Sequence, residues 1–141
     1  MRQVNRRAAL EMIGISLAFG ANAGGQTLSK EHKEFHALDL NEGWRAVAGY
    51  PVGVDEKILS GHLDEAAKRG SLTRLLRFKP GVFTTAPSAH TFWEEVYVLS
   101  GDFDDGGSVY RTGTFLHHPA GSSHSPRSTE GCRLFVFYPE G

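Results

Sequence analysis

The stretch Gly113-Thr-Phe-Leu-His-His-Pro-Ala-Gly-Ser-Ser-His124 decides the fold of this chain. Its first part, residues 114–118, is rich in β-formers and stops at Pro119, because proline cannot continue a central strand. The following Pro-x-Gly sequence is a turn signal that carries His124 onto the return path. We therefore predict a strand over residues 114–118, a tight turn, and a second histidine after it.

A second stretch, His90-Thr-Phe-Trp-Glu94 followed by Glu-Val-Tyr-Val-Leu-Ser-Gly101, also carries an imidazole and a carboxylate. Residues 95–99 favour a strand, which is predicted to end at Gly101-Asp102. Side chains two and four residues apart on a strand share a face. Ser88, His90 and Glu94 would therefore point the same way if residues 88–94 formed one regular strand.

The rest of the chain shows short strand-like runs between turn signals and no convincing amphipathic helix. The region 63–70 is either a connecting loop or one turn of helix. Further strands are predicted at 57–60, 71–78, 83–89 and 132–138. Many short strands at close spacing indicate an all-β sandwich or barrel.

Length and composition indicate a single globular domain. The chain has 141 residues with 15 basic and 16 acidic side chains, dispersed along the sequence. This balance of charges does not indicate nucleic-acid binding, and no segment of the expected mature chain is predicted to span a membrane. The single cysteine, Cys132, excludes an internal disulfide and is expected to be a small buried residue.

The N-terminus has the parts of an export signal. Arg6-Arg7 precedes an apolar run that ends at Ala21-Asn-Ala23, and the paired arginines resemble a twin-arginine signal. An amphipathic helix is the alternative interpretation. The predicted division is an export signal over residues 1–23, a linker over 24–43 and a β domain over 44–141, and the exported protein is expected in the periplasm.

Together the two stretches supply His90, Glu94 and His124, two imidazoles and one carboxylate. This donor set suits an open divalent-metal site for iron(II) or manganese(II), and zinc also accepts three protein ligands plus water. A His-x3-Glu pattern alone occurs by chance, and Glu94 and Glu95 could be a solvated pair at a strand edge. The restrictive spacing of the second stretch is what favours a metal site.

These residues carry a family resemblance. The chain resembles a cupin, a small double-stranded β-helix or jelly-roll barrel, over residues from about 71 to 138. The second cupin motif is matched by Gly113, Pro119, Gly121 and His124, with Ser128 where asparagine is common. The first cupin motif is matched by His90, Glu94 and Gly101. The resemblance is strongest to the ChrR-like branch, which includes the zinc-binding half of certain anti-sigma factors and acetylacetone-cleaving dioxygenases.

The first histidine of the cupin motif is replaced here by Ser88, whose hydroxyl is a poor ligand for a divalent cation. Water could take that position, or a neighbouring histidine could. Strand alternation should turn either His117 or His118 inward, where it could stand in for the missing imidazole or serve as a hydrogen-bond partner of a ligand.

Other polar and aromatic residues have weaker signals. Phe92 and Tyr110 are expected to line a pocket. Arg74 and Arg77 point to opposite faces of a strand, and one of them could contact a bound anion, although such residues are more often solvated. His32, His36 and His62 have no partner at recognisable spacing and are expected at the surface.

The resemblance leaves three functions open. The chain could be a metal-dependent, dioxygenase-like enzyme acting on a small organic molecule, with Ser88, His118 or Tyr110 orienting the substrate or moving a proton. It could be a non-catalytic metal-binding or small-molecule sensor module of the anti-sigma type. Because a ligand is missing at Ser88, it could also be a metal-free binder. Cupins are commonly homodimers, so a dimer is expected by resemblance alone.

Overall fold

The computed structural model describes residues 37–64 and 66–139. The predicted export signal and most of the predicted linker lie outside these residues. The described part is all-β, as predicted, and contains no helix that could cross a membrane. Its strands are β1 (Arg45–Ala46), β2 (Val54–Asp64), β3 (Arg69–Phe78), β4 (Val82–Phe83), β5 (Ser88–Ala89), β6 (Glu94–Asp104), β7 (Val109–Arg111), β8 (Phe115–His118), β9 (Ser123–His124), β10 (Arg127–Ser128) and β11 (Cys132–Tyr138).

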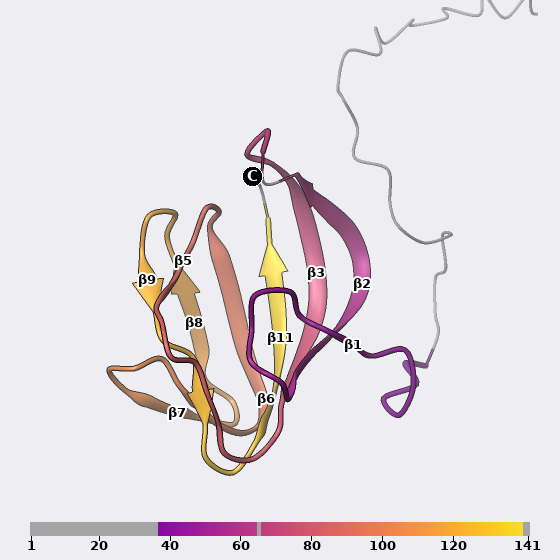
Figure 1. Cartoon of the computed structure of the whole chain (residues 1–141). Coiled ribbons are helices and arrows are strands. Elements are labelled where there is room, and N and C mark those ends of the chain that lie inside the picture. Colours follow the sequence, from indigo (N-terminus) through magenta and orange to yellow (C-terminus); the bar gives the residue numbers. More distant parts are fainter. Residues whose placement is uncertain (1–36, 65, 140–141) are drawn as a thin grey trace, which may run out of the picture.

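The strands form one curled antiparallel sheet and a small two-stranded sheet (Figure 1). The main order is β1-β2-β3-β11-β6-β10-β4, and β7 and β8 both pair with β6. The small sheet joins β5 and β9. Because the sheet curls, β8 and β9 face β2 and β3 across an interior, as expected of a jelly roll (Figure 1).

Alternate residues of the central strands fill the core. Val96 and Val98 on β6 and Leu134 and Val136 on β11 are at most 2% exposed, as the period of two in a half-buried strand requires. Cys132 begins β11 and is buried as expected, and burial raises the pKa of its thiol to about 12. The thiol is therefore unreactive at neutral pH.

The strand that begins at Glu94 continues past the predicted end at Gly101-Asp102 and runs to Asp104. Its register against β11 shifts opposite Arg133 and Leu134, which marks a β-bulge. Gly101 follows the bulge with a φ of 80°, a conformation that glycine adopts readily. The glycine therefore bends the strand and does not end it.

Residues 88–94 do not form one regular strand, contrary to the sequence-based expectation. β5 ends at Ala89, the chain bends at Thr91 and Phe92, and β6 begins at Glu94. The backbone of His90 bonds to Ser122 and Gly121, which continues the pairing of β5 with β9 toward the turn after Pro119, and the chain leaves this pairing only at the bend. His90 and Glu94 approach each other through this bend.

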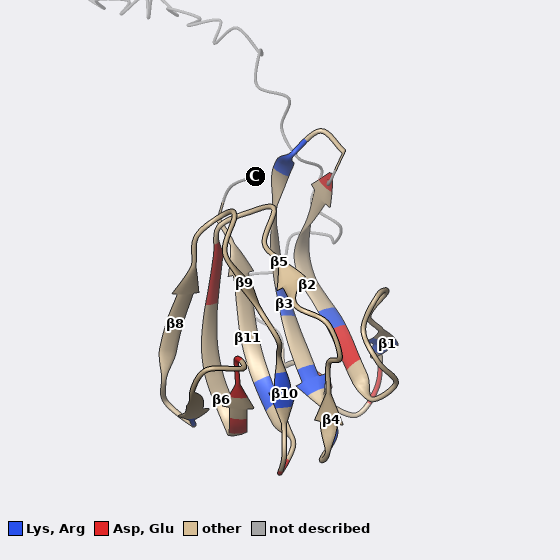
Figure 2. Ribbon diagram, turned by 60° about the vertical axis from the view of Figure 1, so that its left-hand side comes forward, with Lys and Arg blue, Asp and Glu red and all other residues tan. Residues whose placement is uncertain are grey.

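Acidic and basic residues lie on the neighbouring strands β2 and β3 (Figure 2). Arg77 pairs with Asp55 at 2.7 Å on the outer face, where Trp44 also covers its guanidinium. Arg74 pairs with Glu56 at 2.8 Å, and both side chains are largely buried. Arg74 and Arg77 thus lie on opposite faces, and only Arg74 reaches the interior.

Asp102 holds the chain that leads into β11. One of its carboxylate oxygens accepts hydrogen bonds from the Glu130 amide at 2.8 Å and the Ser128 hydroxyl at 3.0 Å, and the other accepts one from the Thr129 amide at 3.1 Å. Burial works against ionisation, but these donors outweigh it and lower the pKa of Asp102. The carboxylate therefore stabilises the fold in its charged form.

We expect Asp102→Asn to lower the free energy of unfolding by about 1–3 kcal/mol at pH 7, because an amide leaves a buried donor unpaired. Since the folded pKa is depressed, this stabilisation is present above the unfolded value of 3.8 and is lost as pH falls through the folded value. Urea unfolding at several pH values should show the difference narrowing below pH 3.8. Glu130→Gln, at an exposed ion pair with Arg111, is the control and should change stability by less than about 1 kcal/mol.

Candidate metal centre

Three histidines converge inside the curled sheet. One ring nitrogen from each of His90, His118 and His124 lies within 4.8 Å of the other two. The ring of His124 is centred 4.6 Å from each of the other rings, and His90 and His118 are stacked at 4.9 Å. His90 directly follows β5, His118 ends β8 and His124 ends β9, and the fold of the two sheets brings the three residues together.

The Pro119 turn positions His90 directly. The amide of His90 donates to the carbonyl of Ser122 at 2.8 Å, and the amide of Gly121 donates to the carbonyl of His90 at 2.8 Å. The turn itself is closed by Ser122, whose amide and hydroxyl both donate to the carbonyl of Pro119. The turn after Pro119 therefore positions two histidines: it binds the backbone of His90 and leads into His124.

Strand register decides which of the two adjacent histidines faces inward. Glu94 lies opposite His118 in the pairing of β6 with β8, and Glu95 lies opposite His117. His118 therefore shares the inner face with Glu94. His117 is exposed on the outer face, where its ring lies 5.3 Å from that of Trp93.

Glu94 is buried beside two of the histidines. Its Oε1 lies 3.3 Å from Nδ1 of His118 and 3.8 Å from Nδ1 of His90, and its Oε2 accepts a hydrogen bond from the hydroxyl of Tyr138. Burial alone would raise the pKa of Glu94, but His118, His90 and Tyr138 outweigh it and lower the pKa. The carboxylate is therefore charged and can act as a ligand or orient one.

The histidines are suited to donate lone pairs. Burial, together with the neighbouring His90, lowers the pKa of His124 to about 4, and burial also lowers the pKa of His90. Both imidazoles are therefore neutral at pH 7. Nε2 of His90, Nδ1 of His118 and Nδ1 of His124 are buried and have no hydrogen-bond partner among the described residues.

These observations fit a divalent cation. Buried polar atoms are normally hydrogen-bonded, so one unpartnered nitrogen on each of three clustered imidazoles needs an explanation. Oε1 of Glu94 lies beside two of the rings, 3.3 Å from Nδ1 of His118 and 3.8 Å from Nδ1 of His90. A cation bound by the imidazoles would satisfy all of these groups, and neutral imidazole is the form that binds metals.

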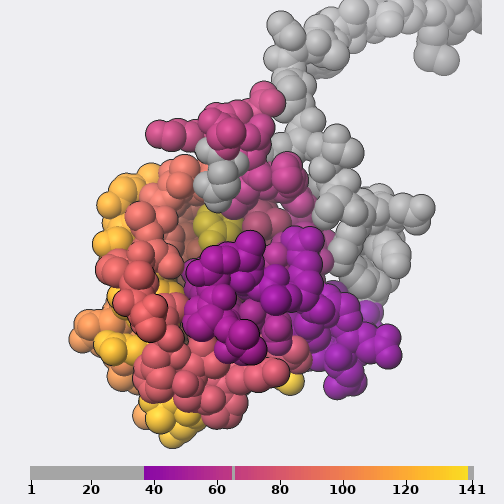
Figure 3. All heavy atoms as spheres, in the orientation of Figure 1, coloured from indigo at the N-terminus to yellow at the C-terminus, as the bar shows by residue number. Residues whose placement is uncertain are grey.

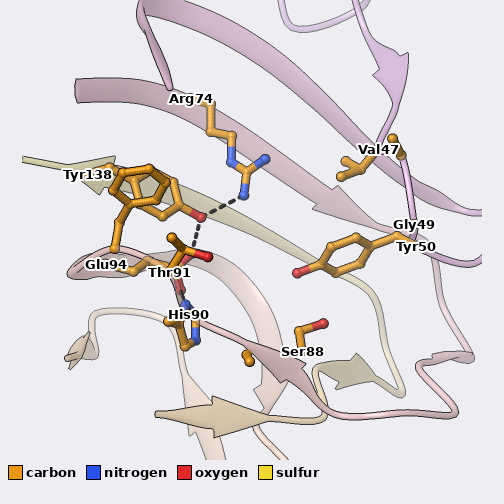
Figure 4. Close-up of a pocket in the computed structure, with 12 residues that line it drawn as sticks. Val47, Gly49, Tyr50, Arg74, Ser88, His90, Thr91, Glu94 and Tyr138 are labelled. Atoms are coloured by element: carbon orange, nitrogen blue, oxygen red, sulfur yellow. Dashed lines mark hydrogen bonds and ion pairs between the residues drawn. The ribbon is translucent and has the colours of Figure 1, made fainter. Parts of the chain in front are cut away.

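A pocket of about 380 Å³ adjoins His90, one of the three histidines (Figure 4). Its polar lining comes from Arg74, Ser88, His90, Glu94 and the two tyrosines at positions 50 and 138. The segment from β1 to residue 53 lies across the open side of the curled sheet, and the surface is hollowed beside it (Figure 3). The pocket is thus a polar chamber in the interior next to the candidate metal centre.

The structure separates the sequence-based candidates. Of the predicted ligands, it brings His90 and His124 together with His118, and it places Glu94 beside the trio. Ser88 lines the pocket and bonds to Tyr50, and Phe92 also lines it. Tyr110 lies apart from this lining, because its hydroxyl donates to Asp105 at 3.0 Å.

Two tyrosines that line the pocket, Tyr50 and Tyr138, were not predicted from the sequence. Tyr138 ends β11, and it follows the inward positions Leu134 and Val136 at the strand period, so alternation could have found it. Burial raises its pKa, so its hydroxyl stays protonated and donates to Glu94. Tyr50 lies in a loop before β2, and no periodicity pointed to it.

The family of the chain follows from comparison with known proteins. Residues 32–140 match the ChrR cupin-like domain, and the chain therefore belongs to this cupin family. The match begins within the predicted linker. No match was found among curated proteins.

Solved structures share the fold at low sequence identity. An RmlC-like cupin from Ralstonia eutropha JMP134 is 24% identical, with a TM-score of 0.57 over 73% of this chain and 67% of that one. A chain in the complex of Rhodobacter sphaeroides SigE with the anti-sigma ChrR is 22% identical, with a TM-score of 0.56 over 71% of this chain and 50% of that one. An acetylacetone dioxygenase from Acinetobacter johnsonii is 15% identical, with a TM-score of 0.59 over 77% of this chain and 76% of that one. These similarities show the cupin fold alone.

Proposed function

We propose that this cupin binds a divalent metal through His90, His118 and His124 and uses it as a dioxygenase-like enzyme on a small organic molecule. The observation that carries the proposal is the cluster of three imidazoles next to a polar pocket. One nitrogen of each ring lies within 4.8 Å of the other two, and each ring has one buried nitrogen without a partner among the described residues. Glu94 is either a fourth ligand or the group that orients His118. Iron(II), manganese(II) and zinc all accept such donors, and ligand type does not choose among them.

A metal held by three or four protein ligands would supply Lewis acidity and, if it is iron(II), redox chemistry with dioxygen. The residues of the chain supply the rest. The pocket has room for a small molecule next to His90 and Glu94. The Tyr138 hydroxyl, which donates to Glu94 and accepts from Arg74 at 2.8 Å, keeps the carboxylate in place.

The alternative is a binding module without catalysis, which the fold shared with a chain in the SigE–ChrR complex supports. Both functions need the same metal, so metal content does not separate them. Dioxygen uptake with dicarbonyl and phenolic compounds does. Consumption of dioxygen supports the enzyme, and tight metal binding without turnover of any compound favours the module.

The test of the metal centre is metal analysis by mass spectrometry on untagged protein purified without oxygen. We expect near-stoichiometric metal in the wild type and almost none in His124→Ala, because the two remaining imidazoles bind a divalent ion poorly. His62→Ala, which removes an exposed histidine of β2, is the matched control and should keep its metal. Unchanged metal content in His124→Ala would refute the proposed centre.

A further inference from the structure

Arg74 lines the pocket but is not among the candidate metal ligands. It projects from β3 toward the same space as the hydroxyl of Tyr50 and lies on the opposite side of the pocket from His90 (Figure 4). Its side chain is only 12% exposed. Burying a guanidinium is costly, so its place in a pocket wall needs a reason.

The partners of Arg74 leave part of the guanidinium free. Nη1 donates to Glu56 and Nη2 donates to the Tyr138 hydroxyl, each at 2.8 Å. Nε is buried and has no hydrogen-bond partner among the described residues. Nη1 and Nη2 each carry a second N–H, and these two donors remain for a ligand that carries acceptor oxygens.

The charges around the pocket favour an anion once a metal is bound. The buried charged groups are one guanidinium, Arg74, and two carboxylates, Glu56 and Glu94. The exposed Arg45 adds a positive charge to Glu56 from the solvent side. Solvent screens the exposed Arg45, so the three buried groups together carry one negative charge. A divalent cation at the histidines would make the site net positive by one, and a ligand with one negative charge would compensate it.

We propose that the pocket binds a small organic monocarboxylate whose charged oxygens are held by Arg74 and the hydroxyl of Tyr50. The inference rests on the proposed function, because the bound metal supplies part of the positive charge. A volume of about 380 Å³ holds roughly a dozen non-hydrogen atoms at the ~30 Å³ that a water molecule takes in the liquid. Apolar atoms of Val47 and Phe92 in the lining would contact the remainder of the molecule.

Calorimetric titration of the metal-loaded full chain with benzoate and with benzamide tests the proposal. The two compounds have nearly the same shape and differ in charge. We expect benzoate to bind at least ~10-fold more tightly, because charge-assisted hydrogen bonds are stronger than neutral ones. Butyrate and butyramide form a second pair without a ring. Equal affinity within both pairs, or no binding of either carboxylate at millimolar concentration, would overturn the proposal.

Substitutions of Arg74 and Tyr50 test whether these pocket residues cause the preference for the carboxylate over the amide. Arg74→Gln should abolish the preference for the carboxylate, and Arg74→Lys should restore part of it. Arg77→Gln is the matched control, because Arg77 lies on the same strand but on the outer face. Tyr50→Phe removes a single hydroxyl and should weaken benzoate binding severalfold, which keeps the test decisive if Arg74→Gln fails to fold. A preference that survives in both Arg74→Gln and Tyr50→Phe would refute the proposed contacts.

Metal content measured on the same samples separates this proposal from the proposed function. Metal at full occupancy with equal binding of benzoate and benzamide overturns the carboxylate proposal alone. A wild-type protein that takes up no metal overturns the proposed function, and with it the carboxylate proposal that depends on the charge of the cation.

Discussion

Replacing His118 by alanine is expected to lower the affinity for the metal on the order of a hundredfold or more. Partners that merely orient a ligand already contribute 10–100-fold to affinity, and His118 presents its own nitrogen to the trio. The change also removes the imidazole that lies beside Glu94 on the paired strand β8. Competition with a chromophoric chelator, followed at constant pH because ligand protonation opposes binding, measures the affinity.

His117→Ala is the matched control for this prediction, since it removes the same side chain one residue away. His117 is exposed on the outer face against Trp93, and its loss should leave metal affinity within about twofold. Circular dichroism should show that both variants keep their strands. If both variants bind metal like the wild type, His118 is not a ligand. If His117→Ala alone loses metal, the register of β8 against β6 is wrong.

The adjacent histidines show how far sequence reasoning reaches. Alternation along a strand requires one of His117 and His118 to face inward, and this follows from the sequence alone. Which of the two does so depends on the cross-strand pairing of Glu94 with His118. Register is a long-range property, and a slip of one residue would exchange the two faces. The sequence therefore predicted the pair but left the choice open.

The approach of His90 to Glu94 was predicted for the wrong reason. Regular alternation placed the two side chains on one face of one strand, whereas the chain bends between them. The bend is stabilised by backbone hydrogen bonds from His90 to the turn after Pro119. These bonds join two segments that are about 30 residues apart, and periodicity within one segment carries no information about such contacts.

The all-β class and the inward positions of the central strands were predictable because they depend on local patterns. The alternation in 132–138 correctly predicted β11, and the β-formers in 95–99 predicted the first half of β6. The pocket was harder to predict. For an anion contact, the sequence left Arg74 and Arg77 as alternatives. Tyr50 lines the pocket because the loop before β2 folds over the open side of the sheet. Loop positions of this kind carry no periodic signal.

Gly101, which was predicted to end a strand, should be among the positions where substitution most lowers the free energy of unfolding. Gly101 has a φ of 80°, and a Cβ at this position would overlap the carbonyl oxygen of Gly131 on the neighbouring segment. We expect Gly101→Ala to lower the free energy of unfolding by roughly 2–5 kcal/mol. The left-handed backbone accounts for about 1–2 kcal/mol, and displacement of the adjacent chain accounts for about 1–3 kcal/mol.

Gly121→Ala separates the two contributions. Gly121 has a similar φ of 86°, but a Cβ there meets no atom within 4 Å. This variant should therefore lose only the backbone contribution, about 1–2 kcal/mol, and it keeps the amide that donates to His90. Urea unfolding of both variants gives the comparison. Equal losses of stability would mean that the segment around Gly131 moves aside at no energetic cost and that the bend in β6 tolerates a side chain. A larger loss in Gly101→Ala would show that glycine is required there by the close approach of β6 to the start of β11.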